Sequence, residues 1–208
     1  MKIHPFYFSW SKRLLDVVVS LVVLVVLSPL LVGVGLSIWL TAGWPMFFWQ
    51  KRMGKAGKTF TIYKFRTMKR DAEKLQGKYL KLNEAPAPMF KLRHDPRFVG
   101  IGKFLAGCGL DELPQLINIL QGEMSLVGPR PLPINEAKKL PQSWRKWREQ
   151  VRPGIFSEWS VRLTNNVSLQ QWQKWEKQTL NQGGVDYELS LISKTFRRLL
   201  GKFFNLGS

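Results

Sequence analysis

The fold is decided by LLDVVVSLVVLVVLSPLLVGVGLSIWL, residues 14–40, an apolar stretch near the start of the chain. No charged side chain occurs between Val17 and Leu40, and about 20 apolar residues are enough for a helix to cross the hydrocarbon core of a bilayer. The stretch is too long for the apolar region of a typical cleaved signal peptide. Its length therefore predicts a membrane element and favours it over a helix packed in a soluble core.

The middle of this stretch contains a helix break at Ser28-Pro29. Pro29 lacks a backbone donor and clashes with the preceding turn, while Ser28 can satisfy a freed carbonyl in lipid. Basic residues flank the stretch on both sides: Lys12 and Arg13 before it, and Lys51, Arg52, Lys55 and Lys58 after it. Because basic flanks stay on the cytoplasmic side, a re-entrant hairpin satisfies both ends, with Trp39, Trp44 and Trp49 at the interface. The residues alone leave a straight span equally open.

Positive charge dominates the composition of the 208-residue chain, whose net charge is +18. Such a charge predicts anionic partners, and the apolar stretch favours anionic inner-leaflet lipids and a phosphorylated substrate over nucleic acid. The two histidines, His4 and His94, are too few for a histidine-rich zinc site, so any metal is expected to be a hard cation such as Mg²⁺. The lone Cys108 excludes an internal disulfide framework, fits a cytosol-facing domain and is expected to be a small buried residue.

The rest of the chain predicts a small mixed domain. Two short strands at residues 46–49 and 60–63 flank the glycine-bearing turn 54–58. Helices are predicted over residues 69–82, 113–120, 142–150 and 187–204, the third of them basic and aromatic and suited to a headgroup surface. The fold class expected is α+β and mostly helical, with a membrane hairpin at 1–45 and a cytosolic, membrane-associated catalytic domain with interfacial amphipathic helices at 46–208.

Two adjacent carboxylates, Asp111 and Glu112, lie in the sequence LDELPQ at 110–115. They fall at the predicted start of the 113–120 helix, where the helix dipole and free N–H groups would keep them ionised. Taken alone, the pair is better explained as a helix cap. Carboxylates are scarce in this chain, however, and apolar and glycine-rich sequence surrounds these two, which favours a functional site.

Basic residues in two further motifs suit phosphate binding. Arg130 lies in GPRP at 128–131, where rigid neighbours hold the guanidinium in one pose for bidentate phosphate recognition. A proline-rich turn with a solvated arginine explains the tetrapeptide equally well. Lys64 and Arg66 alternate with aromatic residues in YKFRTM at 63–68, so they are expected either to line the same anion site or to contact lipid headgroups.

With these motifs in place, the chain resembles the bacterial sugar transferases, the monotopic polyprenol-phosphate phosphoglycosyl transferases of minimal, single-domain type. The resemblance extends over nearly the whole chain: KRLLD at 12–16, the Ser28-Pro29 break, residues 57–68, DPR at 95–97, LDELPQ at 110–115, residues 122–131 and RPGI at 152–155.

The resemblance implies a reaction and a role for each motif. Members transfer a sugar-1-phosphate from a UDP-sugar to undecaprenyl phosphate and release UMP, on the cytoplasmic face of the bacterial inner membrane, to initiate a surface glycan. Their helix turns back at the Ser-Pro break, which favours the hairpin. Asp111 would be the nucleophile that forms a covalent aspartyl-phosphosugar intermediate and would hold Mg²⁺. Glu112 would position the lipid phosphate or the metal, and Arg130 would bind a substrate phosphate.

The chain also departs from the family pattern. Ala106 stands where the family usually has a basic residue, Gly109 where it has a hydroxyl, and FSEWSV at 156–161 replaces the usual Thr-Gly-Trp-Ala-Gln-Val. The family's acidic residue of the last helix appears as Glu188. One alternative function is therefore a non-catalytic membrane-bound relative that acts as an assembly partner. Another is a basic peripheral lipid-binding module, which explains the charge but not the motifs at 111 and 130.

Overall fold

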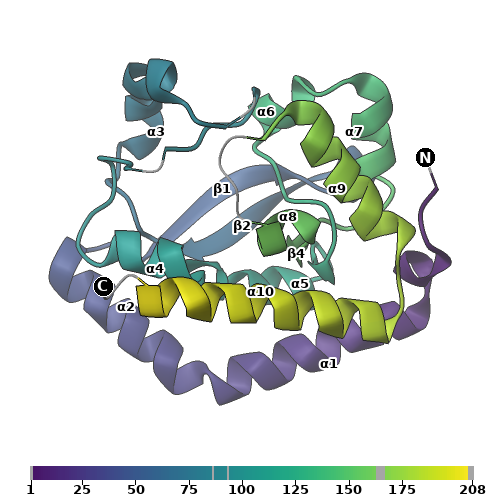
Figure 1. Ribbon diagram of the computed structural model, residues 1–208. Helices are drawn as coiled ribbons and strands as arrows, with labels where there is room; N and C mark the ends of the chain where they lie inside the picture. The colour runs from purple at the N-terminus through teal and green to yellow at the C-terminus, as the bar shows by residue number, and fades with distance from the viewer. Residues whose placement is uncertain (1, 86, 93, 163–166, 206–208) are drawn as a thin grey trace.

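The computed structural model describes residues 2–85, 87–92, 94–162 and 167–205, and in it helices surround two small sheets (Figure 1). The strands are β1 (Phe47–Met53), β2 (Thr59–Phe65), β3 (Ser125–Val127) and β4 (Gly154–Phe156). The α-helices are α1 (Trp10–Val26), α2 (Ser28–Ala42), α3 (Ala72–Leu75), α4 (Gly102–Cys108), α5 (Gln115–Leu120), α6 (Ile134–Lys138), α7 (Gln142–Arg148), α8 (Glu158–Arg162), α9 (Leu169–Asn181) and α10 (Val185–Asn205). Short 3₁₀ helices are η1 (Pro5–Phe8), η2 (Lys55–Gly57), η3 (Gln76–Leu82) and η4 (Leu110–Glu112). The mostly helical mixed fold predicted from the sequence is confirmed.

Helices α1 and α2 form a bent pair with a 63° angle at the break. Pro29 occupies the first turn of α2, where its missing N–H costs nothing, and the Ser28 hydroxyl donates to the Val25 carbonyl at 2.8 Å. The predicted break is confirmed. Within the described residues no single helix is long and apolar enough to cross a membrane, whereas the bent pair meets the length and composition requirements together.

The outer face of the bent pair is apolar and exposed. Val25, Val26 and Leu40 are 65%, 67% and 78% exposed, and leaving such side chains in water is unfavourable. The predicted interfacial tryptophans Trp39, Trp44 and Trp49 are exposed as well. Exposed apolar side chains over two successive helices are the surface expected of an element that lies in lipid.

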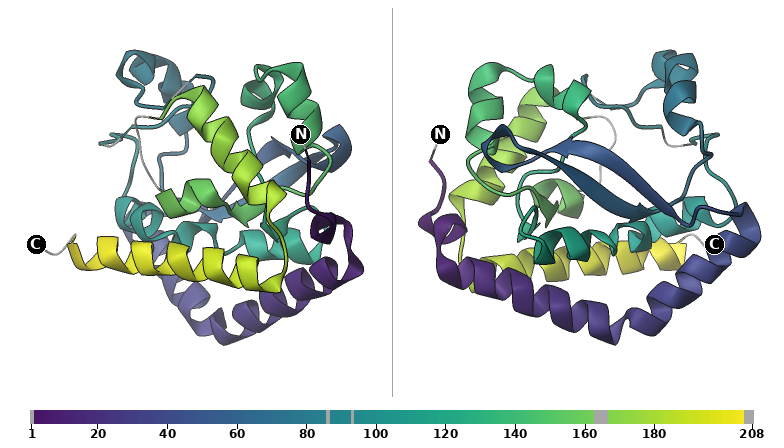
Figure 2. Two further views of the ribbon diagram at one scale, coloured as in Figure 1. Left: turned by 45° about the vertical axis from the view of Figure 1, so that its right-hand side comes forward. Right: turned by 180° about the vertical axis from the view of Figure 1, so that it is seen from behind.

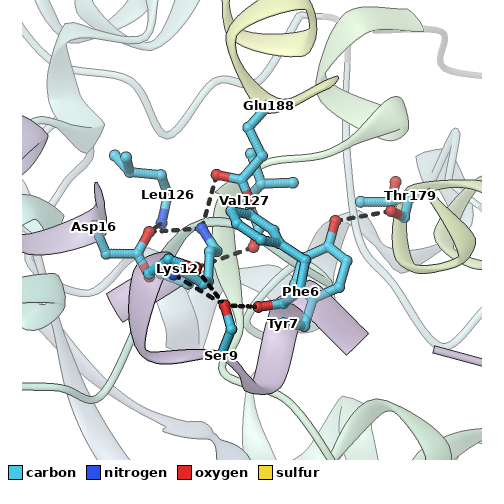
Figure 3. A network of polar contacts seen from close by, with 11 residues as sticks. Phe6, Tyr7, Ser9, Lys12, Asp16, Leu126, Val127, Thr179 and Glu188 are labelled. Carbon is cyan, nitrogen blue, oxygen red and sulfur yellow. Dashed lines mark hydrogen bonds and ion pairs between the residues drawn. The ribbon is translucent and has the colours of Figure 1, made fainter. Parts of the chain in front are cut away.

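The inner face of α1 is held by a buried charge network, shown in Figure 3. The Lys12 ammonium donates to Asp16 at 2.6 Å and to Glu188 of α10 at 2.8 Å, and all three side chains are almost fully buried. Asp16 also accepts from the Leu126 N–H of β3 at 2.9 Å. Burial raises the pKa of Glu188 to about 7 although Lys12 opposes this. Buried charges persist only when paired, so the network fixes α1 against α10 and β3.

The basic residues before the apolar stretch therefore act inside the protein. Lys12 is 3% exposed, and Arg13 donates to the carbonyls of Ile119 and Leu120 at the end of α5, at 2.6 and 3.0 Å. The Ile119 carbonyl also accepts from the Gly122 N–H at 2.9 Å, and a basic side chain at a helix C-terminus supplies further donors to the last carbonyls. The boundary at residue 45 remains a prediction, since α1 shares its interior contacts with the rest of the chain.

Strands β1 and β2 form the predicted hairpin, with an antiparallel register from Phe47↔Phe65 to Met53↔Thr59. Both strands are longer than predicted. The turn needs two residues with positive φ, Ala56 at 55° and Gly57 at 71°. Its tip is bound by the Glu149 carbonyl, which accepts from Ala56 N–H at 2.6 Å, so the hairpin is fixed at the end next to α7.

Strands β3 and β4 pair in parallel and approach very closely beyond Val127. A Cβ on Gly154 would lie 2.0 Å from the backbone nitrogen of Gly128, so a side chain at this position has no room. This close approach places the turn 128–131 beside β4.

Several predicted helices differ from those observed. Residues 69–82 form only the short α3 and η3, and the helix predicted to start at residue 113 begins at Gln115. Helix α7 begins where predicted and ends at Arg148 rather than at residue 150. Trp144 and Trp147 are 1% and 3% exposed, so the prediction that this helix suits a headgroup surface is wrong. Cys108 is half-buried rather than buried.

Candidate active site

The adjacent carboxylates Asp111 and Glu112 lie in η4, one short turn before α5. Helix α4 ends at Gly109, whose φ of 75° only glycine adopts without cost, and the chain then turns into η4. The carboxylate pair therefore lies just ahead of the following helix, as predicted, but in a 3₁₀ turn of its own. Asp111 is 8% exposed, whereas the Glu112 side chain is 24% exposed.

Three of the predicted charged residues meet at this turn. Lys64 of β2 is 2.6 Å from Glu112 (Nζ to Oε1), and Arg130 is 4.0 Å from the same oxygen (Nη2 to Oε1). They line a cleft of about 240 Å³ between the β1–β2 hairpin, η4, α5 and the turn 128–131. Residues from three distant parts of the chain thus form one site with carboxylates and cations side by side.

The two neighbouring carboxyl groups differ in pKa. Burial raises the pKa of Asp111 to about 7, with Lys64 opposing and the Glu112 charge adding to the shift. Burial acts on Glu112 in the same direction, but Lys64 and Arg130 outweigh it and lower its pKa to about 2. Glu112 is therefore ionised and ion-paired, and Asp111 is the more basic group. The prediction that both carboxylates are kept ionised thus holds for Glu112, whereas burial opposes it for Asp111. Separated pKa values are typical of carboxylate pairs with different roles.

The donor set suits a hard cation only in combination with substrate oxygens. Among the described residues, no group of three or more histidine, cysteine, aspartate or glutamate side chains could hold a metal ion. Mg²⁺ in phosphoryl-transfer sites usually binds one or two carboxylates plus phosphates and water. The carboxylates of Asp111 and Glu112 fit that pattern.

The guanidinium of Arg66 binds backbone carbonyls outside the cleft. It donates to the carbonyls of Ala42 and Gly43 at 2.5 and 2.6 Å and of Trp44 at 3.2 Å. These are the last carbonyls of α2 and the residues after it, so Arg66 stabilises the end of the bent pair. The structure thus does not support the prediction that Arg66 binds a substrate phosphate.

A buried ion pair that the sequence did not reveal holds the backbone of Arg130. Arg148 of α7 donates to the Arg130 carbonyl at 2.5 Å and binds Glu176 of α9 at 2.7 and 3.0 Å. Glu176, which is 1% exposed, also accepts from the Trp144 indole at 3.0 Å. Because Arg148 and Glu176 are 28 residues apart, no local pattern could have joined them.

A comparison with models of protein families shows to which family the chain belongs. The family model described as bacterial sugar transferase matches residues 7–202, which include the bent pair, both cleft motifs and most of α10. The chain belongs to the bacterial sugar transferase family. The resemblance inferred from the motifs is thereby confirmed.

Individual members of the family are similar along most of this chain. It is 34% identical over 201 residues to the galactosyl transferase CpsE of Streptococcus agalactiae, covering 96% of this chain but 44% of the relative. It is 33% identical over 189 residues to the exopolysaccharide production protein ExoY of Sinorhizobium fredii, covering 89% and 83%. The UDP-glucose:undecaprenyl-phosphate glucose-1-phosphate transferase of Escherichia coli is 36% identical over 191 residues, covering 88% and 39%. The chain thus spans less than half the length of two of these sugar transferases.

Proposed function

We propose that this bacterial sugar transferase moves a sugar-1-phosphate from a UDP-sugar to undecaprenyl phosphate, releases UMP and so initiates a surface glycan. The observation that carries the proposal is the cleft in which Glu112 faces Lys64 and Arg130. The buried carboxyl group of Asp111 lies beside it in η4. The names of relatives add to it, since the Escherichia coli relative is named for this reaction with UDP-glucose. The apolar bent pair supports a site at the cytoplasmic face of the bacterial inner membrane.

In the proposed mechanism Asp111 attacks first. A carboxylate oxygen of Asp111 bonds to the phosphorus that carries the sugar, and the bond from this phosphorus to the bridging oxygen breaks, so that UMP leaves with the electron pair. An oxygen of undecaprenyl phosphate then attacks the same phosphorus and displaces Asp111. Carboxylates are competent nucleophiles in such double displacements, and the more basic carboxylate of the pair is the better one.

The neighbouring charged residues would position the phosphates and neutralise their charge, and phosphoryl transfer depends mainly on these two effects. In the structure, Lys64 and Arg130 neutralise the charge of Glu112. A substrate phosphate bound in the cleft would contact the same two cations. When bound, Mg²⁺ held by Asp111 and substrate oxygens would neutralise the diphosphate.

The reaction class is tested by UMP release from a panel of UDP-sugars with undecaprenyl phosphate and Mg²⁺. Sustained release with one donor, and no more than one UMP per chain without the lipid phosphate, would support the proposal and name the sugar. Absence of release from every donor would favour the non-catalytic assembly partner and make Ala106, on the exposed side of α4, the first departure from the family pattern to follow up.

A re-entrant hairpin places both of its flanks on the cytoplasmic side, and this can be measured. In a Cys108→Ser background, Lys2→Cys and Lys58→Cys introduce exposed thiols on either side of the bent pair. We expect an impermeant maleimide to label both only after the cytoplasmic face is opened. Labelling of residue 2 from the periplasm of intact cells would establish a straight span instead.

The pair Arg148–Glu176 is expected to position Arg130. Replacing Glu176 with glutamine leaves the buried Arg148 charge without its partner and frees the Arg130 carbonyl to shift. We expect kcat/KM for the UDP-sugar to fall about tenfold or more, mainly through a higher KM, because a misplaced phosphate contact weakens binding.

Steady-state kinetics with Lys174→Gln as control test this expectation, since Lys174 is exposed on the same helix. A variant with a lower melting temperature but wild-type KM would show that Glu176 has only a structural role.

A further inference from the structure

Besides the predicted site residues Lys64, Glu112 and Arg130, the cleft is lined by Arg52. The sequence marked Arg52 only as a basic residue after the apolar stretch. Arg52 of β1 lies directly opposite Phe60 in the hairpin register, so its side chain is on the same face as those of Phe60, Ile62 and Lys64. Lys64 is four residues along β2 from Phe60, or about 13 Å at 3.3 Å per residue. The same face of the hairpin thus presents one cation at each end of the cleft, both lining it.

No carboxylate of the described residues forms an ion pair with Arg52, although the charges of Glu136, Glu112 and Glu73 act on it from a greater distance. Its Nη1 donates to the Pro131 carbonyl at 3.0 Å, and its buried Nε has no hydrogen-bond partner in the described part of the chain. Burial and then the charge of Arg130 lower the pKa of Arg52 to about 10, which leaves it charged at neutral pH. Two arginines that repel each other while lining one cleft are stabilised by an anion between them.

The two ends of the cleft differ in what they adjoin. Lys64 pairs with Phe48 near the end of α2, next to η4 and its carboxylates. Arg52 forms a bridge with Pro133, immediately before α6. Figure 2 shows the hairpin running from the end of α2 to the region of α6 and α7, away from the bent pair. A lipid phosphate would approach from the bent pair, so the Arg52 end is open to the other substrate.

Building on the proposed function, we propose that Arg52 and Arg130 together bind the nucleotide-side phosphate of the donor. The diphosphate then lies along the cleft, with the sugar-bearing phosphate toward Asp111 and Lys64 and the other phosphate between the two arginines. When Asp111 attacks, the bridging oxygen keeps the electron pair of the broken P–O bond and leaves as part of UMP. Guanidinium donors on this phosphate stabilise the charge that develops there, and Arg52 transfers no proton.

Equilibrium binding of UDP to the full chain in the Asp111→Asn background tests this contact without turnover. We expect Arg52→Gln to weaken UDP binding in the presence of Mg²⁺ about 10- to 100-fold, the usual effect of losing hydrogen bonds to a charged group. Arg52→Lys should lie in between, because it keeps the charge but loses the planar fork. Lys51→Gln should bind UDP as its parent does, since Lys51 is exposed on the opposite face of the same strand.

Arg52 also supports the Pro131 carbonyl, so melting temperatures are measured for every variant. If Arg52→Gln melts below the assay temperature, the proposal is judged by the affinity of Arg52→Lys for UDP. An unchanged Kd for UDP in the folded variant would overturn the proposal. An unchanged Kd for UDP together with a raised KM for undecaprenyl phosphate, measured with Arg52→Gln in a chain that retains Asp111, would overturn it too and assign Arg52 to the acceptor. If Asp111 is not the nucleophile, Asp111→Asn will still turn over. That result is separate from the UDP affinities, and the comparison of Kd values between the Arg52 variants remains valid.

Discussion

Asp111→Asn should abolish UMP release while the protein remains folded and membrane-associated. Removing a covalent nucleophile eliminates the first step of a double displacement, and we expect kcat to fall by at least about 1,000-fold. The amide is nearly isosteric with the carboxyl group. Because burial already favours the neutral form of Asp111 and raises its pKa to about 7, a neutral replacement should not destabilise the fold. UMP release with the preferred UDP-sugar and undecaprenyl phosphate is the measurement.

The matched control for this variant is Glu112→Gln at the adjacent position. Glu112 is ionised and ion-paired with Lys64, so its replacement removes charge positioning rather than the nucleophile and should leave measurable residual turnover. Near-normal turnover by Asp111→Asn, with melting temperature and membrane fractionation equal to wild type, would remove Asp111 as the nucleophile. Equal inactivation of both variants would show that the two carboxylates act as a unit.

The largest stability effect is expected for Lys12→Met. Loss of the ammonium leaves Asp16 and Glu188 as buried carboxylates without their cation, and removing one partner of a buried ion pair costs about 3–5 kcal/mol. We expect the free energy of unfolding to fall by that amount, as measured by urea denaturation in detergent. Lys174→Met, which removes an exposed ammonium from α9, should change the free energy by less than about 0.5 kcal/mol.

A triple variant separates the charge network from the packing of α1. Lys12→Met combined with Asp16→Asn and Glu188→Gln removes all three charges and keeps an acceptor for the Leu126 N–H. Neutral replacement of a whole buried network is often tolerated, so the triple variant should be more stable than Lys12→Met alone. If Lys12→Met were as stable as wild type, the network would not be what fixes α1.

Features set by local sterics were predictable from the sequence. The bend at Ser28-Pro29 follows from the missing donor and the bulk of proline, and the β1–β2 hairpin follows from alternating side chains around glycines. The charged stretch 69–82 does not form the continuous helix that was predicted, and the reason is physical. Leu80 and Leu82 are 58% and 64% exposed and only Ala72 of this segment is buried. Little apolar surface is therefore covered, and helices rely on such packing for their stability.

Features set by contacts distant in the sequence were not predictable. Arg66 was expected at a phosphate site or at lipid headgroups, and Arg148 lies in a helix expected to suit a headgroup surface. Their partners, the end of α2 and Glu176, are more than 20 residues away along the chain. For the same reason the basic-aromatic pattern of α7 did not reveal that its tryptophans are buried. The convergence of Lys64, Arg130 and the 111–112 pair was expected only because the motifs resemble a family, since their spacing alone does not bring them together.

The central claim is a covalent sugar-phosphate on Asp111, and intact-protein mass spectrometry tests it most directly. The wild-type chain is incubated with its preferred UDP-sugar and Mg²⁺ in the absence of undecaprenyl phosphate. We predict a mass gain equal to one sugar phosphate, one UMP released per chain, an adduct that maps to the peptide containing Asp111, and its loss when the lipid phosphate is added. No adduct, in a preparation that turns over fully once undecaprenyl phosphate is supplied, would contradict the account and establish direct transfer from donor to acceptor.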